Sequence, residues 1–185
     1  DLKNKVNIMK RSSGVLMHIS SLPGEYSIGT FGKHAKAFVD FLSDCGFSYW
    51  QVLPFSMVDE CNSPYKSYSA FAGNPFFIDP ETLFEQRLIT ADELLEARQK
   101  TPYACEFDRL RTDRMNLLFK ASLRVTDRKA VYDFIGQKPY IKQACEFMAL
   151  KDANEQKPWW EWTTDVCDPD VLFMHKFIQF KFHAQ

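Results

Sequence analysis

The stretch that decides the fold class runs over residues 14–54 and reads GVLMHISSLPGEYSIGTFGKHAKAFVDFLSDCGFSYWQVLP. Its first part, Gly14–Ile19, is a short apolar run, which predicts a buried strand. The residues from Lys33 to Cys45 place apolar side chains at helical spacing and are followed by Gly46, so they predict a helix. A second apolar run, Tyr49–Pro54, predicts another strand. This order predicts a βαβ unit with parallel strands and a right-handed crossover.

The remainder of the chain divides into a long loop and a mainly helical part. Residues 56–75 are polar and aromatic, and an ordered loop of this length is usually functional. Thr90 and Glu93 have the spacing of a capping box, and Asp168 before Pro169 is typical of a helix N-terminus. Apolar stripes at helical spacing predict three further helices, on Leu110, Leu117, Leu118 and Ala121; on Ile141, Ala144, Cys145 and Met148; and on Phe173, Phe177 and Phe180. Two strands followed only by helices leave both sheet edges unpaired, which predicts an incomplete sheet.

Composition is that of an ordinary soluble globular protein. Hydrophobic residues make up 45% of the 185 residues, charged residues 25%, and the formal net charge is -1. This charge does not favour nucleic acid or an anionic membrane surface. Aromatic residues are abundant at 15%. Most of them are expected in the core, while a few Tyr or Trp rings are suited to stacking on sugars.

Five cysteines occur singly along the chain, at Cys45, Cys61, Cys105, Cys145 and Cys167. An odd number without a CxxC pair argues against a disulfide framework and against a zinc site. We therefore expect reduced thiols in a cytoplasmic protein. No apolar run approaches the roughly 20 residues that span a bilayer, and residues 1–10 lack the apolar part of a secretory signal.

Three blocks of the sequence resemble the amylomaltase family, the disproportionating 4-α-glucanotransferases. The most specific is Ser63–Pro75, SPYKSYSAFAGNP, which resembles the family's signature loop. Ser13–Gly24 resembles its opening strand and loop, and Tyr49–Pro54 its second strand. The blocks keep the family's order and spacing, and the resemblance covers nearly the whole chain but only the front portion of the family's length.

The loop departs from the family pattern at four positions. Cys61 and Asn62 stand where the family usually has Gly-Asp, Lys66 where Gln is common, and Tyr68 where Phe is common. The changes at Asn62 and Lys66 are expected to alter hydrogen bonding to sugar hydroxyls, and so to affect specificity.

The resemblance implies an α/β fold that contains the first strands of a (β/α)8 barrel with a mostly helical insertion. At 185 residues the chain is short of the roughly 250 of a complete barrel. We expect a first βαβ unit at 1–55, a substrate-facing loop at 56–80, and a helical insertion at 81–185 that leads back toward the rest of the barrel.

The resemblance also implies the chemistry. A retaining glucanotransferase forms a covalent glycosyl intermediate on one carboxylate while a second carboxyl group, about 5–5.5 Å away, acts as acid and then base. In the family these carboxylates lie on later strands, so no residue here is assigned as catalytic. The resemblance places Ser63 and Tyr65 among the residues that contact the glucan. The alternative is that Ser63 starts a turn and Tyr65 packs under the loop.

Three hypotheses for the whole chain follow, and the Ser63–Pro75 block argues against the third, another barrel enzyme that acts on a different sugar. The first is a portion of a 4-α-glucanotransferase that acts on malto-oligosaccharides, without a metal, nucleotide or redox cofactor. The second is a carbohydrate-binding or structural fragment without turnover of its own. The sequence does not decide the oligomeric state.

Other polar and aromatic residues have plainer interpretations. His18 is expected to bond backbone, and Asn74 to fix its loop. Asp59 and Glu60 are adjacent in sequence, which does not suit a catalytic pair, so solvated loop charges are expected. Trp159, Trp160 and Trp162 suggest sugar stacking, but we favour a packing cluster between the insertion helices and the barrel. Asp165, Asp168 and Asp170 lack the pattern of a calcium loop, and Asp168 is better explained as a helix cap.

Overall fold

The computed structural model describes residues 11–185, and residues 1–10, where the sequence predicts no secretory signal, lie outside the described part. Strand β1, Gly14–Leu16, pairs in parallel with β2, Tyr49–Gln51, with Val15 opposite Trp50. Helix α1, Lys33–Asp44, connects them, and Gly46 has the positive φ of 78° that suits a residue just beyond a helix end. The predicted order of strand, helix and parallel strand is confirmed.

The expectation that the first strand is buried is wrong. Leu16 and Tyr49 are 61% and 66% exposed. Each strand has three residues, and the sheet within residues 11–185 has only these two strands. Apolar strand residues are buried by neighbouring strands and by layers on both faces, and the described residues supply no third strand to cover these.

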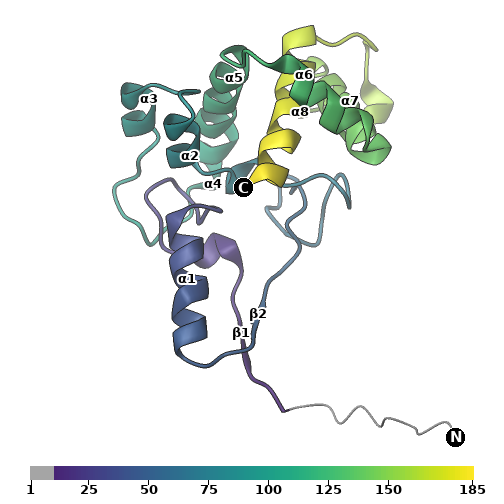
Figure 1. The fold of residues 1–185 in the computed structure, drawn as a ribbon. Helices are drawn as coiled ribbons and strands as arrows, with labels where there is room; N and C mark the ends of the chain where they lie inside the picture. Colours follow the sequence, from purple (N-terminus) through teal and green to yellow (C-terminus); the bar gives the residue numbers. More distant parts are fainter. Residues whose placement is uncertain (1–10) are drawn as a thin grey trace, which may run out of the picture.

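The helical part contains α2 (Pro80–Glu85), α3 (Ala91–Glu96), α4 (Phe107–Arg109), α5 (Met115–Leu123), α6 (Arg128–Gly136), α7 (Pro139–Ala153) and α8 (Pro169–Ala184). A π-helical turn, Leu110–Arg114, joins α4 to α5. Figure 1 shows these helices at one end of the molecule and the β1–α1–β2 unit at the other. Within residues 11–185, no helix has both the length and the apolarity needed to cross a membrane.

Local signals explain where several helices begin. The capping box at Thr90 and Glu93 is confirmed, with both reciprocal bonds present. Asp168 accepts hydrogen bonds from the amides of Asp170 and Val171, so its assignment as the cap of α8 is also confirmed. These caps satisfy backbone donors that have no partner within the helix.

The main core lies where α8 packs against α5 and α6. Its central side chains, including Phe173, Phe177 and Leu118, are 0–1% exposed. A second core joins the βαβ unit to the helical part, and its buried members are Ile19, Leu22, Ile28, Ala35, Phe76, Phe77 and Leu110.

Arg114 crosses between these parts. It is 4% exposed and donates hydrogen bonds to the backbone oxygens of Tyr26, Phe76 and Ile78. Arg114 therefore joins the loop before α1 to the segment that leads into α2.

Candidate functional site

Residues 56–73 fold back on themselves as a narrow ribbon. Ser56 and Gly73 form an antiparallel bridge, and the Met57 amide donates to the Ala72 oxygen at 3.1 Å. Nearer the tip, the Asp59 amide donates to the Lys66 oxygen at 3.3 Å. The segment predicted as a loop is thus ordered by its own backbone bonds, and it displays residues 60–65 at its tip.

Helix α8 holds the base of this ribbon. The Gln179 side chain accepts a hydrogen bond from the Gly73 amide at 2.8 Å and donates one to the Gly73 oxygen at 2.9 Å. Gln179 is 2% exposed. A side chain at residue 73 would meet Phe182 of α8, since a Cβ there would lie 2.2 Å from the Phe182 ring. Glycine is required here for the close approach of helix and ribbon.

The base also includes Asn74, whose side chain accepts a hydrogen bond from the Phe76 amide at 3.0 Å. The expectation that Asn74 fixes the loop is confirmed. His18 lies close by, and its Nδ1 accepts a hydrogen bond from the Leu53 amide at 3.2 Å. The expectation of a backbone-bonded histidine is confirmed too, and burial lowers the pKa of His18.

Arg111, in the π-helical turn, holds the ribbon near its tip. Its Nη2 donates to the Asp59 oxygen at 2.6 Å and to Oδ1 of Asn62 at 2.5 Å. Asn62 has a positive φ of 56°, a conformation that Asn tolerates better than most residues. The guanidinium therefore bonds both the backbone and a side chain near the tip of the ribbon.

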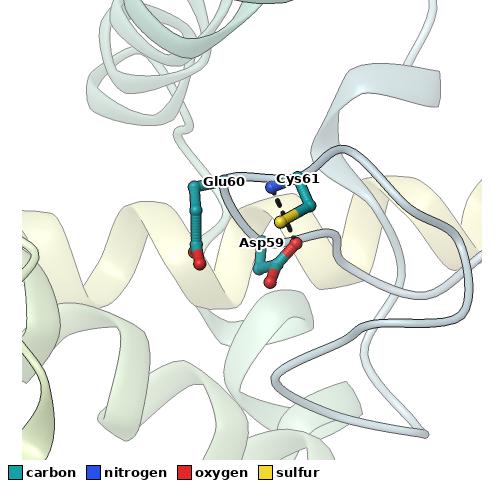
Figure 2. Close-up of side chains that lie close together, drawn as sticks. All are labelled: Asp59, Glu60 and Cys61. Atoms are coloured by element: carbon teal, nitrogen blue, oxygen red, sulfur yellow. Dashed lines mark hydrogen bonds between the residues drawn. The ribbon is translucent and has the colours of Figure 1, made fainter.

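Asp59, Glu60 and Cys61 point their ligand-type atoms toward one another (Figure 2), within 4.8 Å. Lys66 lies among them, with its Nζ 2.5 Å from Asp59 Oδ2, 3.2 Å from Glu60 Oε1 and 3.7 Å from Cys61 Sγ. The three candidate ligands thus surround an ammonium group of the chain itself. We interpret the cluster as an ion-pair network.

The expectation that Asp59 is a solvated charge is wrong, because this residue is 3% exposed. Burial raises the pKa of Asp59, but the Lys66 ammonium and the Cys61 amide outweigh it and hold the pKa below its usual range. The close contact with the Asp59 carboxylate in turn raises the pKa of Lys66. Lys66 touches Asp59 Oδ2 without the alignment of a hydrogen bond, so charge attraction dominates that contact. Glu60 is exposed, as expected.

Ser63 and Tyr65, the predicted glucan contacts, lie together at the ribbon's tip. Ser63 Oγ accepts a hydrogen bond from the Tyr65 amide at 3.3 Å, and the Ser63 oxygen accepts one from the Lys66 amide at 3.2 Å. Ser63 therefore starts a turn. The Tyr65 ring is 74% exposed, so it does not pack under the loop. Their contact with a glucan stays a prediction.

The expected tryptophan cluster is only partly present. Trp162 contacts the Phe147 ring of α7 at a centroid distance of 5.3 Å and donates a hydrogen bond to the Lys157 oxygen. Trp159 and Trp160 are each 67% exposed. Within residues 11–185 no element covers these two rings, and their packing against a barrel stays a prediction.

Sequence reasoning missed Arg111 and Gln179. Each contacts the ribbon across a long separation, 49 residues to Asn62 for Arg111 and 106 residues to Gly73 for Gln179. The sequence offered one weak signal for Gln179, which is a polar residue beside the apolar stripe of its helix.

Comparison with known proteins agrees with this geometry. The family model described as 4-alpha-glucanotransferase, of glycoside hydrolase family 77, matches residues 17–185. A 4-alpha-glucanotransferase of Streptococcus pneumoniae is 43% identical over 159 residues, covering 83% of this chain and 31% of the relative. That of Aquifex aeolicus is 36% identical over 196 residues, covering 95% of this chain and 39% of the relative.

A solved structure, an amylomaltase from Streptococcus agalactiae in complex with acarbose, has a TM-score of 0.85 and 33% sequence identity. The match covers 95% of this chain and 39% of that one. The chain thus spans about a third of the length of the curated relatives that it matches. The resemblance and the α/β fold class are confirmed. The chain belongs to the 4-alpha-glucanotransferase family, and corresponds to a portion of its members.

Proposed function

We propose that this chain is the portion of a 4-α-glucanotransferase that presents a glucan-contacting loop, the ribbon 56–73, to malto-oligosaccharides. The observation that carries the proposal is the Tyr65 ring, 74% exposed at the tip of a ribbon that helices hold at its base. A rigidly held aromatic ring with a polar end suits a sugar, which has both apolar C–H faces and hydroxyl groups. The relative solved with acarbose supports the same class of ligand.

The parent protein is proposed to be a (β/α)8 barrel that acts in the cytoplasm. Strands β1 and β2 would be its first two strands, and the loops after barrel strands face the active site. The ribbon is the segment that follows β2 along the chain, which supports a position on that face. The division into a βαβ unit, a substrate-facing loop and a helical insertion belongs to the same proposal.

The chemistry is proposed to be glycosyl transfer with retention, through a covalent intermediate on an enzyme carboxylate. The nucleophile and the acid/base belong to later strands of the barrel, so the residues described here would bind and orient the donor. Holding donor and acceptor in reactive geometry is a large part of such catalysis.

The test uses the enzyme that carries these residues, with maltotriose as the only substrate. Transfer is expected to release glucose and to form longer glucans. Glucose without any longer product would instead show a hydrolase. The 185-residue chain alone is expected to give no turnover, and turnover above a blank would mean that it holds catalytic groups of its own.

A second test addresses Tyr65 and Ser63. Tyr65→Ala and Ser63→Ala are each expected to raise KM for maltotriose by about tenfold, because they remove contacts with bound glucan. Tyr103→Ala is the matched control, since Tyr103 is also exposed, at 85%, and lies outside the ribbon. Equal KM values for the Tyr65 and Tyr103 variants would contradict the assignment.

A further inference from the structure

We propose that Asp59, Lys66 and Arg111 are positioning residues, which together close the tip of the ribbon and set how tightly Ser63 and Tyr65 hold a glucan. We call these three residues the clamp. The inference rests on the proposed function, and it adds three residues that act through the shape and position of the turn.

The first step is that Asp59 and Lys66 close the tip as a ring. Their backbones are joined by a hydrogen bond of 3.3 Å, and their side chains approach to 2.5 Å. Ser63 and Tyr65 lie in the sequence between Asp59 and Lys66, and so within the closed ring. Joining a loop at both backbone and side chain removes conformations that the tip would otherwise lose on binding, so a closed tip binds with a smaller entropic cost.

The second step concerns charge. Asp59 has a side chain only 4% exposed, whereas that of Lys66 is 61% exposed. A buried carboxylate is strongly unfavourable once its partner is removed, whereas replacing both charges by neutral groups is often tolerated. The pair is therefore asymmetric: loss of the lysine charge alone disturbs the turn more than loss of both charges.

The third step is the connection to the helices. Arg111 bonds the Asp59 oxygen and the Asn62 side chain, so it ties the ring to the turn between α4 and α5. Without Arg111 the ring would still close, but its position relative to the helical part would no longer be fixed at the tip. The clamp thus supplies both the shape and the placement of the turn.

The clamp also limits which residues can replace Lys66. A glutamine side chain carries no charge and cannot neutralise a buried carboxylate at residue 59. In this chain Lys66→Gln is therefore not a neutral exchange unless Asp59 changes with it.

The test compares the single variant Lys66→Gln with a double variant, both made in the enzyme that carries these residues. Lys66→Gln is expected to raise KM for maltotriose about tenfold with kcat changed less than about twofold, because the tip acts on binding. Combining it with Asp59→Asn is expected to return KM to within about threefold of the wild type. Arg111→Met is expected to raise KM similarly.

Lys129→Gln provides the matched control, since it removes an exposed lysine that pairs with Asp133 outside the ribbon. It should leave KM unchanged. The inference is overturned if Lys66→Gln leaves KM unchanged, or if the double variant is no better than Lys66→Gln alone, which is the result expected of a purely local loss of stability.

A second measurement needs no glucan. Amide hydrogen exchange at Asn62 and Lys66, whose amides bond the Asp59 and Ser63 oxygens, is expected to be at least about tenfold faster in Lys66→Gln and in Arg111→Met. It should recover in the double variant. Unchanged exchange refutes the clamp whatever the activity. Changed exchange in a parent without transfer activity refutes the proposed function and leaves the clamp standing.

Discussion

The Glu93 side chain takes part in both a helix cap and an ion pair. It accepts a hydrogen bond from the Thr90 amide at 2.9 Å and two from the Arg124 guanidinium, at 2.6 and 2.9 Å. The hydrogen bonds from Arg124 are the main reason that the pKa of Glu93 falls to about 2. The capping box therefore also carries an ion pair that joins α3 to the end of α5.

This lowered pKa predicts acid sensitivity. Unfolded, Glu93 has its ordinary pKa of 4.5, so at a pH between that value and about 2 the unfolded chain binds the extra proton. The stability contributed by Glu93 is complete above pH 4.5 and is lost as the pH falls toward 2. Urea unfolding followed by circular dichroism should show a smaller loss of stability between pH 6 and pH 3 in Glu93→Gln than in the wild type.

The same comparison needs an exposed control, and Glu155→Gln supplies it, because the Glu155 side chain is 81% exposed. Its pH dependence should match that of the wild type. If Glu93→Gln and Glu155→Gln lost equal stability between pH 6 and pH 3, the role of Arg124 in lowering the pKa of Glu93 would be contradicted.

At the residue scale, the sequence predicted local partners and missed distant ones. The capping box follows from a spacing of three residues, and the Asn74 and Asp168 bonds are equally short in range. Asp59 was expected in solvent, because nothing near it in sequence shows that Arg111 and the ribbon cover it. Burial of a charge depends on elements that meet only in the folded chain.

At the element scale, the helices were easier to predict than the strands. Helix α1 was expected from Lys33 to Cys45 and runs from Lys33 to Asp44, since its apolar spacing and Gly46 are both local. Strands β1 and β2 were placed correctly, but each is shorter than its apolar run. A strand is stabilised by neighbours, and its length and burial therefore depend on residues that a local pattern does not contain.

The most consequential element is α8, and a prediction tests it. Phe177 is 0% exposed and belongs to the core that α8 shares with α5 and α6. Phe177→Ala is expected to lower the free energy of unfolding by about 3–5 kcal/mol, through lost burial and a cavity. Urea denaturation of both proteins measures the difference.

The control for this prediction is Leu95→Ala on α3, because Leu95 is 66% exposed. It should change the free energy of unfolding by less than about 0.5 kcal/mol. If the two variants lost the same stability, α8 would not be the centre of the core.

At the scale of the whole molecule, the ribbon depends on helices that come much later in the chain. Gln179 and Phe182 of α8 fix its base, and Arg111 fixes its tip. The sequence predicted a functional loop with Ser63 and Tyr65 in it, through a resemblance carried by neighbouring residues. It could not predict what holds that loop, because these contacts join segments with no common local pattern.

The tether between Gln179 and Gly73 has a consequence for design. An amide both accepts and donates, whereas a carboxylate only accepts, and a protonated carboxyl group does both again. Gln179→Glu should therefore keep both bonds at low pH. Burial raises the pKa of an introduced carboxyl group above about 4.3, so the stability is present below that value and is lost as the pH rises through the raised pKa.

Unfolding measured at pH 4 and pH 8 would show this as a deficit relative to the wild type that grows with pH. Gln179→Met lacks both bonds at every pH, so its stability deficit relative to the wild type should be the same at pH 4 and pH 8. An equally constant deficit in Gln179→Glu would contradict a role for the proton. In the Gln179→Glu variant, a single proton would then determine whether the base of the ribbon stays bonded to α8, so this joint would hold at low pH and open at high pH.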